Sequence, residues 1–413
     1  MFGKLNINDF DYHLPKEKIA YYPAKNRTHS KLLVFDKDKI IHSIFDNISN
    51  FISPGSLLIV NSTKVLPARI LLKKDTGGVV EFLLLEPYNM DISTSLNSKV
   101  TTDWNCIVGG RNIRVGRMFT VIRDNVIITI EILKRHDNRA VIRFHWKNEE
   151  VSHTADVLTF AEILEKVGQV PLPPYIKRVI TDKDISDYQT IYANNLGSVA
   201  SPTAGLHWTS DILDGLKNSG VKISELNLHI GMGTFVPISG SIKDHKMHSE
   251  KLLIHKETIA NLLLQYHNNT PVIATGTTSL RTLESLYWFA IQIIKNKINN
   301  TRYNENSGFY ISQGEIYENK YDIDLVEIFN VLLDFMDKKS LKYLQGSTEI
   351  FIVPGYNIKT IDGLITNFHL PKSTLMLLVS AFVGTENIKN IYKEALENNY
   401  RFLSYGDSSL LLR

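Results

Sequence analysis

The chain has 413 residues, which exceeds the roughly 100–200 residues of an ordinary domain, so we expect two or three domains. Hydrophobic residues make up 43% of it and charged residues 22%, which is typical of a globular protein and excludes extensive disorder. The net charge of +3 neither indicates nor excludes nucleic-acid binding, because an RNA footprint can be a local patch.

The single cysteine, Cys106, excludes several kinds of site. The chain has no second thiol for an internal disulfide, and it lacks the cysteines of a thiolate zinc site or an iron–sulfur cluster. We expect Cys106 to be a buried, unreactive thiol. The N-terminus has no apolar signal core, and the stretch 375–384 is about half of the roughly 20 residues that span a membrane. We therefore expect a cytoplasmic protein without membrane association.

Residues 1–65 mix helical and strand signals, with a buried strand predicted at 31–36 and another at 56–60. From 66 to 150 the pattern changes to short alternating strands, predicted at 68–72, 79–85, 117–123, 126–135 and 139–146. Turn signals separate them, including 75–78, 124–125 and 137–138. Evenly spaced strands without intervening helices indicate a small antiparallel β-barrel. Because both flanks are α/β in pattern, we interpret the barrel as an insertion.

Helices and strands alternate beyond residue 150, which predicts a layered α/β/α domain made of residues 1–65 and 151–413. Amphipathic helices are expected over 154–168 and 210–220, and a further helix precedes the strand 271–275. Residues 295–308 are polar and rich in Asn, which is typical of a loop, and 322–344 indicate an added helical segment. We expect this connector, 287–345, to lie on the outside of the α/β domain.

The sequence VIATGTTSLRTLES places a strand before Gly276 and a helix after it. The first N–H groups of such a helix, with the hydroxyls of Thr277, Thr278 and Ser279, suit a carboxylate or phosphate. Arg281 in the first turn could add a bidentate contact. Ordinary helix capping explains the same residues and stays an alternative.

Three histidines stand at comparable junctions between a strand and a loop or helix, namely His207, His229 and His369. Ligands bind at that edge in open α/β sheets, so these three junctions and the one before Arg281 together predict one convergent polar site. His245 and His248, three residues apart and followed by Glu250, could share one helical face and bind a metal, but no further ligand spacing supports a metal site there. We therefore expect no metal.

The chain resembles the S-adenosylmethionine:tRNA ribosyltransferase-isomerases of queuosine biosynthesis. The resemblance covers both ends and nearly all of the chain outside 287–345. It rests on motifs in order, including FDYHLPKEKIAYYP, GSVASPTAGLHWT, LHIGMGTFVPI, MHSEKLLI, ATGTTSLRTLES, TNFHLPKSTLMLLVSAFVG and YRFLSYGDSSLL.

The resemblance implies an α/β catalytic domain interrupted by a β-barrel. It also implies transfer of the ribosyl group of S-adenosylmethionine to 7-aminomethyl-7-deazaguanine at the tRNA wobble position, with release of adenine and methionine. S-adenosylmethionine is then a co-substrate, and no prosthetic group is expected. We expect a monomer whose partners are the donor and tRNA.

The expected chemistry requires a base and an acid in the site, and it requires that the incoming amine be kept neutral. His229, Glu250, His369 and His207 are the candidates for these proton transfers. The candidates for the donor site are Gly276, Thr277, Thr278, Ser279 and Arg281. Lys177, Arg178, Arg111, Arg114 and Arg117 are the candidates for contacts to tRNA. A methyltransferase using the same donor, and a non-catalytic RNA-binding module built on the barrel, are the alternatives.

We predict turnover that needs no metal ion, because the sequence offers no convincing ligand cluster. Activity should be unchanged after exhaustive treatment with a chelator. Loss of activity that one specific divalent ion restores would contradict the prediction.

Overall fold

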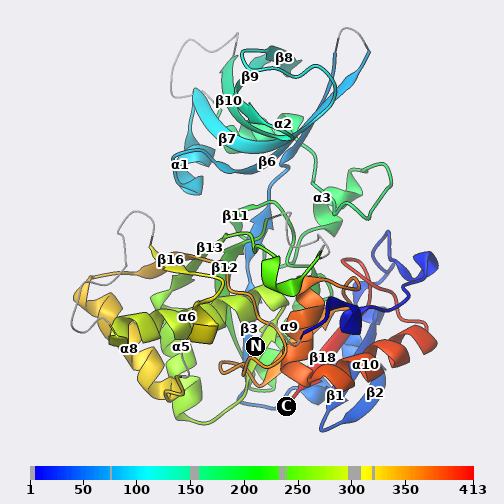
Figure 1. The fold of residues 1–413 in the computed structure, drawn as a ribbon, viewed down its shortest axis with the longest axis vertical. Helices are drawn as coiled ribbons and strands as arrows, with labels where there is room; N and C mark the ends of the chain where they lie inside the picture. The colour runs from blue at the N-terminus through cyan, green and yellow to red at the C-terminus, as the bar shows by residue number, and fades with distance from the viewer. Residues whose placement is uncertain are drawn as a thin grey trace.

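The computed structural model describes residues 5–74, 77–148, 158–231, 238, 240–295, 308–318 and 321–413. Figure 1 shows a small β-rich body above a larger α/β body, joined by a narrow neck near β11. Two short parallel strands pair in that neck, β4 (Thr63–Val65) and β11 (Asn195–Ser198). The chain therefore leaves the large body after β3 and returns to it at β11.

Ten strands of the described chain form one mixed sheet in the large body. Its four central strands, β12, β3, β14 and β17, run parallel, and their near-continuous burial is typical of parallel strands covered on both faces. In spatial order the strands are β15 (Phe309–Ile311), β16 (Tyr343–Thr348), β13 (Glu250–His255), β12 (Lys222–His229), β3 (Leu57–Asn61), β14 (Val272–Thr275), β17 (Gly363–Asn367), β18 (Ser408–Leu412), β1 (Lys31–Asp36) and β2 (Lys39–Ile44).

Helices cover both faces of this sheet, which gives the expected α/β/α layers. Strand β3 shows why, since Leu57 and Ile59 belong to one apolar cluster while Leu58 and Val60 belong to the other. The first cluster includes α5 (Lys256–His267), α6 (Thr277–Lys295), α8 (Leu325–Lys338), α9 (Thr374–Val383) and α10 (Thr385–Glu397). The second includes α4 (Ser210–Asn218) and the 3₁₀ segment Phe45–Phe51. Two short helices, α3 (Lys183–Asp187) and α7 (Glu315–Glu318), lie in connections.

The small body is a nearly closed antiparallel sheet of six strands within the described residues. Alternate side chains fill its interior, and Phe160 of α2 packs against Trp104, Phe144 and Trp146 there. The strand order is β5 (Arg69–Lys73), β6 (Val79–Pro87), β7 (Thr101–Gly109), β10 (Arg139–Asn148), β9 (Val126–His136) and β8 (Met118–Arg123), with α1 (Ile92–Asn97) and α2 (Phe160–Val167) beside it.

The predicted barrel strands are confirmed to within two residues at most ends. The turns at 124–125 and 137–138 have left-handed backbone at Asp124, Asn125 and Asp137, which Asp and Asn tolerate. Cys106 is fully buried in the barrel, and burial raises the pKa of its thiol. Residues 75 and 76 of the first predicted turn lie outside the described residues, and the domain boundaries at 65/66 and 150/151 stay predictions.

One predicted helix and the possible helical spacing of two histidines differ from the structure. The one expected over 154–168 begins at Phe160, because Thr159 and Glu162 form a capping box, and 154–157 lie outside the described residues. His245 and His248 share no helical face, because they precede the strand β13 in extended chain. No group of three or more potential metal ligands occurs among the described residues.

The connector 287–345 packs on the large body, where β15 is an edge strand of the sheet and α8 lies at the periphery (Figure 1). Residues 287–295 continue α6 and most are buried, β15 extends the sheet beside β16, and the ring of Phe309 stacks on that of Phe289 with centroids 4.3 Å apart. Helix α8 packs its apolar face against α5 and α6. Its amphipathic pattern predicted burial but not the partner. The predicted loop at 295–308 lies almost wholly outside the described residues.

Leu332→Ala should lower the free energy of unfolding by about 2–5 kcal/mol, because Leu332 of α8 is fully buried in the main core. Chemical denaturation measures the change. Asp334→Ala on the exposed face of α8 is the matched control and should change stability by less than about 0.5 kcal/mol. Equal stability of the two variants would show that α8 is not part of the folded core.

Candidate active site

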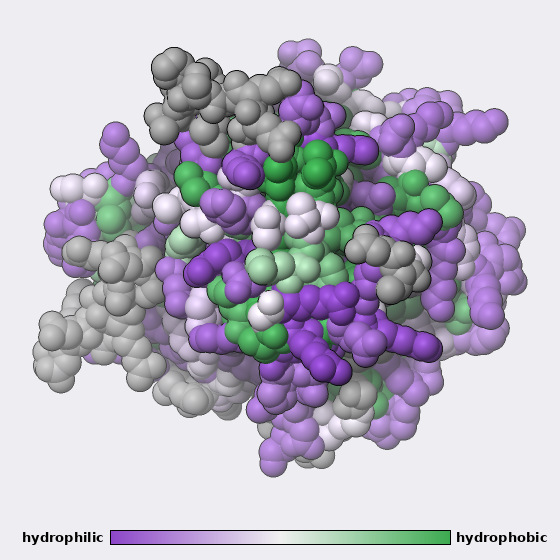
Figure 2. Space-filling view, turned by 90° about the horizontal axis from the view of Figure 1, so that it is seen from above, coloured by the Kyte–Doolittle hydropathy of each residue, from purple (hydrophilic) through white to green (hydrophobic). Residues whose placement is uncertain are grey.

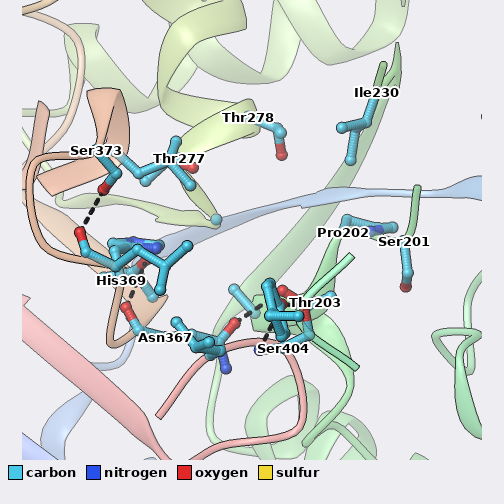
Figure 3. Close-up of a pocket in the computed structure, with 17 residues that line it drawn as sticks. Ser201, Pro202, Thr203, Ile230, Thr277, Thr278, Asn367, His369, Ser373 and Ser404 are labelled. Atoms are coloured by element: carbon cyan, nitrogen blue, oxygen red, sulfur yellow. Dashed lines mark hydrogen bonds between the residues drawn. The ribbon is translucent and has the colours of Figure 1, made fainter. Parts of the chain in front are cut away.

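A cavity of about 640 Å³ lies where the parallel strands β14 and β17 end. This is the carboxyl edge of the sheet, where open α/β folds bind ligands. Hydroxyl groups are common in its wall, and Figure 3 shows them arranged around the empty space. They belong to Ser201, Thr203, Thr277, Thr278, Thr366, Ser373 and Ser404.

The turn at Gly276 shapes one side of the cavity. Its φ of 90° is favourable for glycine, and its N–H donates to the carbonyl of Ile365 (2.8 Å), which ties the end of β14 to β17. Helix α6 begins at the next residue, Thr277. The hydroxyl of Thr278 is buried, points into the space and has no hydrogen-bond partner in the described part of the chain. The turn therefore offers free donors at a helix N-terminus.

Ser279 does not line this cavity, because its hydroxyl donates to the carbonyl of Thr275 (2.7 Å) inside the helix. Arg281 does not line it either, but contacts a neighbouring cavity together with Glu250. Its Nη1 donates to Oε2 of Glu250, and both side chains are buried. Its Nε and Nη2 have no partner among the described residues. The pair joins two predicted site residues that are 31 positions apart.

His207 lies behind the cavity and positions Asn367, which lines it. The Ser30 hydroxyl donates its proton to the carbonyl of Arg27 (2.5 Å), so its oxygen accepts from Nδ1–H of His207 (2.9 Å). The bare Nε2 then accepts from the Asn367 amide at 3.5 Å, while Thr203 donates to Oδ1 of Asn367 at 3.0 Å. One histidine tautomer therefore fixes the orientation of the amide.

His369 lines the same cavity, and its Nε2 lies 2.9 Å from the Thr366 hydroxyl. Burial lowers the pKa of His369 to about 3 and that of His207 to about 4. Both imidazoles are therefore neutral at pH 7. A neutral imidazole can accept a proton, so His369, the histidine that lines the cavity, is in the protonation state of a base.

His229 ends β12 and lines a separate, larger cleft of about 1700 Å³ between the barrel and the large sheet. Burial lowers its pKa to about 4, and Nδ1 has no partner in the described structure. A Cβ at Gly197 would lie 2.3 Å from this ring, so glycine is required there. The next residue, Ile230, lines both the cleft and the cavity, which places the two spaces side by side.

The five predicted tRNA-binding residues lie in two places. Arg178 forms two hydrogen bonds to the buried carboxylate of Asp184, at 2.5 and 2.7 Å, while Lys177 lines a hollow beside it. Arg111, Arg114 and Arg117 are exposed in and beside the loop before β8, outside the cleft.

The sequence prediction missed several lining residues, among them Ser201, Thr203, Asn367 and Ser404. Their signal was present, because each lies in a short stretch of small or polar residues at a strand end.

Unfolding should take up a proton at His207, because its pKa is about 4 in the folded chain and about 6.5 when unfolded. The free energy of unfolding therefore falls as the pH drops from about 6.5 to about 4, and His229 and His369 act in the same direction. His207→Gln should reduce the slope of stability against pH at pH 5 by about 1 kcal/mol per pH unit.

Chemical denaturation at a series of pH values measures this slope. Leu213→Ala is the control. Leu213 belongs to the apolar cluster of Phe45, whose ring packs on His207, and its loss destabilises the protein without removing a titrating group. An unchanged slope for His207→Gln would contradict the burial of His207 as a neutral imidazole.

Comparison with known proteins agrees with the resemblance seen in the motifs. The model of the queuosine biosynthesis protein family matches residues 7–411. An S-adenosylmethionine:tRNA ribosyltransferase-isomerase of Carboxydothermus hydrogenoformans is 37% identical over 412 residues, which cover 99% of this chain and all of the relative. One from Clostridium kluyveri is 36% identical over 98% of this chain and all of its own length.

A solved S-adenosylmethionine tRNA ribosyltransferase from Thermotoga maritima is 26% identical, with a TM-score of 0.47, and covers 98% of this chain and all of its own. None of the helices in the described residues is long and apolar enough to span a membrane. From the family match and the full-length relatives, the chain belongs to the queuosine biosynthesis protein family.

Proposed function

We propose that the chain transfers the ribosyl group of S-adenosylmethionine to 7-aminomethyl-7-deazaguanine at the tRNA wobble position and isomerises it to epoxyqueuosine. Membership of the family over nearly the full length carries this conclusion. The cavity at the carboxyl edge of β14 and β17, beside a cleft open to a larger substrate, supports it. A cytoplasmic location follows from tRNA as the substrate.

We place the donor in the cavity, with its methionine carboxylate at the start of α6. The N–H groups of that helix start and the free hydroxyl of Thr278 are suited to an anion. The described side chains of the cavity wall carry no charge. The sulfonium and the ribose therefore meet hydroxyl groups and the amide of Asn367. Arg281 is the second candidate for the carboxylate, since two of its donors have no partner in the described chain.

The histidines divide the proton transfers between the two spaces. The sulfonium acidifies the ribose 5′ hydrogens, and His369 lines the cavity as a neutral imidazole that can accept one of them. His229 in the cleft accepts the proton of the incoming ammonium, which leaves a nucleophilic amine. The imidazolium formed at His369 returns its proton to adenine as the bond from ribose to adenine breaks. The amine nitrogen forms the new bond to a ribosyl carbon, and the carbon–sulfur bond breaks with its electron pair leaving on the sulfur of methionine. His207 acts only through Asn367, and Glu250 is held by Arg281.

Identification of the released small molecules tests the proposed function. The protein is incubated with S-adenosylmethionine and tRNA carrying the deazaguanine precursor. Adenine and methionine in equal amounts are the expected products. Release of S-adenosylhomocysteine would show a methyltransferase instead, and binding of tRNA with no released product would show a non-catalytic RNA-binding protein.

Thr278→Val should weaken S-adenosylmethionine binding by about one to two orders of magnitude, because a hydrogen bond to a charged group contributes about 1.5–3 kcal/mol. Calorimetry measures the dissociation constant. Thr282→Val is the matched control, since the Thr282 hydroxyl donates within α6 and lies outside the cavity. If Thr278→Val binds the donor normally while Arg281→Gln, made together with Glu250→Gln, does not, the carboxylate is held by Arg281.

A further inference from the structure

The cleft between the two bodies has walls from both of them. The barrel contributes Leu83, Leu85 and Pro87, all in β6. The large sheet contributes His229 and Lys251. Its volume of about 1700 Å³ is more than twice that of the donor cavity. Because Ile230 lines both spaces, a polymer lying in the cleft can present one group to the donor cavity while the rest of it stays outside.

Two cations, Arg139 and Lys251, stand on opposite walls of this cleft. Arg139 begins β10 of the barrel, and Lys251 lies in β13 of the large sheet. Both side chains are exposed, and neither forms an ion pair or a side-chain hydrogen bond within the described residues. The nearby Arg143 differs, because Asp103 holds it by two hydrogen bonds of 2.8 and 2.9 Å. Glu86 is the one carboxylate among the described residues of the cleft wall.

The positive charge continues from the cleft onto the barrel. A shallow hollow shares Leu85, Glu86 and Arg139 with the cleft and adds three basic side chains, Lys134, Arg135 and His136. Lys134 is held over the ring of Tyr88, and Arg135 donates to the carbonyls of Asp137 and Ile113. Lys134 and Arg135 form no ion pair within the described residues and are exposed at the end of the β9–β10 hairpin, whereas Nδ1 of His136 lies 3.3 Å from the carboxylate of Asp137.

Figure 2, viewed from the barrel end, shows mostly hydrophilic side chains around a smaller apolar area. Lysine and arginine side chains that line a groove and form no ion pair with a carboxylate are typical of sites for a phosphate backbone. RNA fits better than an acidic peptide. In the proposed function the reacting amine belongs to a nucleotide, and that nucleotide must turn out of its strand to reach the cavity.

We infer that the cleft is a clamp for single-stranded RNA, with Arg139 and Lys251 contacting phosphates on either side of the nucleotide that enters toward His229. The basic hollow at the end of the β9–β10 hairpin holds the next phosphates along the strand. This inference rests on the proposed function, and it assigns the contact to residues other than Arg111, Arg114, Arg117, Lys177 and Arg178.

The test uses the full chain with Arg139→Gln and Lys251→Gln, singly and together. Binding of the precursor tRNA is measured at several salt concentrations. Each substitution should reduce the slope of log affinity against log salt by about one unit, and the weakening should be similar for tRNAs of different sequence. Binding of S-adenosylmethionine by calorimetry should not change, because neither residue lines the donor cavity.

Two matched controls remove the same charge elsewhere. Arg123→Gln lies on β8 of the barrel and Lys39→Gln on β2 at the far edge of the large sheet, and both residues are exposed outside the cleft. The controls should keep the salt slope of the unmodified protein. An unchanged slope in the Arg139 and Lys251 variants, or an equal decrease in the controls, would overturn the clamp.

The clamp and the proposed function can fail separately. If the unmodified protein binds tRNA through these two residues but releases no adenine, the proposed reaction is wrong and the clamp stands. If it releases adenine while the Arg139 and Lys251 variants bind tRNA with an unchanged salt slope, the reaction stands and the clamp is wrong.

Discussion

The parallel arrangement of β14 and β17 determines where the chemistry of this protein can take place. Three register pairs, from Ile273 with Gly363 to Thr275 with Ile365, bring the two strand ends to the same edge of the sheet. The N–H of Gly276 then bonds to Ile365, so the turn into α6 and the chain after β17 face each other. Residues from both exits line the cavity that we propose for the donor. Shifting either strand by one residue would move the facing side chains to the other side of the sheet.

The fold separates two tasks that the proposed reaction combines. The proposed donor site offers uncharged hydroxyls and a helix N-terminus inside the large body, whereas the cations proposed to contact RNA lie in the cleft and on the barrel. The parallel pair β4 and β11 joins the two bodies, so its pairing sets the position of the barrel above the large sheet. Ile230 is the boundary between the two spaces, and His229 beside it is the titratable group nearest to that boundary in sequence.

Local signals in the sequence predicted well where a strand gives way to a turn or helix. They predicted poorly which side chains from distant elements contact each other. A strand, Gly276 and a helix start can be predicted from adjacent residues, and so can Ser373 and Thr209, whose hydroxyls cap α9 and α4. No local pattern shows that Glu250 reaches Arg281, since this contact depends on how β13 and α6 pack. For the same reason His207 was expected in the site itself, although the structure places it behind Asn367.

The segment after α6 shows the same limit on a larger scale. The apolar positions of α8 require that one face of the helix is buried. The sequence did not show that this face packs on α5 and α6. The short strand β15 had too few residues for a periodic signal, yet it extends the sheet and brings Phe309 onto Phe289. Pattern predicts burial, whereas the choice of partner is a property of the whole chain.

A structure of the protein with S-adenosylmethionine and an anticodon stem-loop bound would test the account most directly. The account predicts the donor in the cavity between Thr203, Thr278 and Asn367, with the wobble nucleotide reaching it past Ile230 from the cleft. A donor bound in the cleft beside His229, with RNA on another face of the molecule, would contradict it.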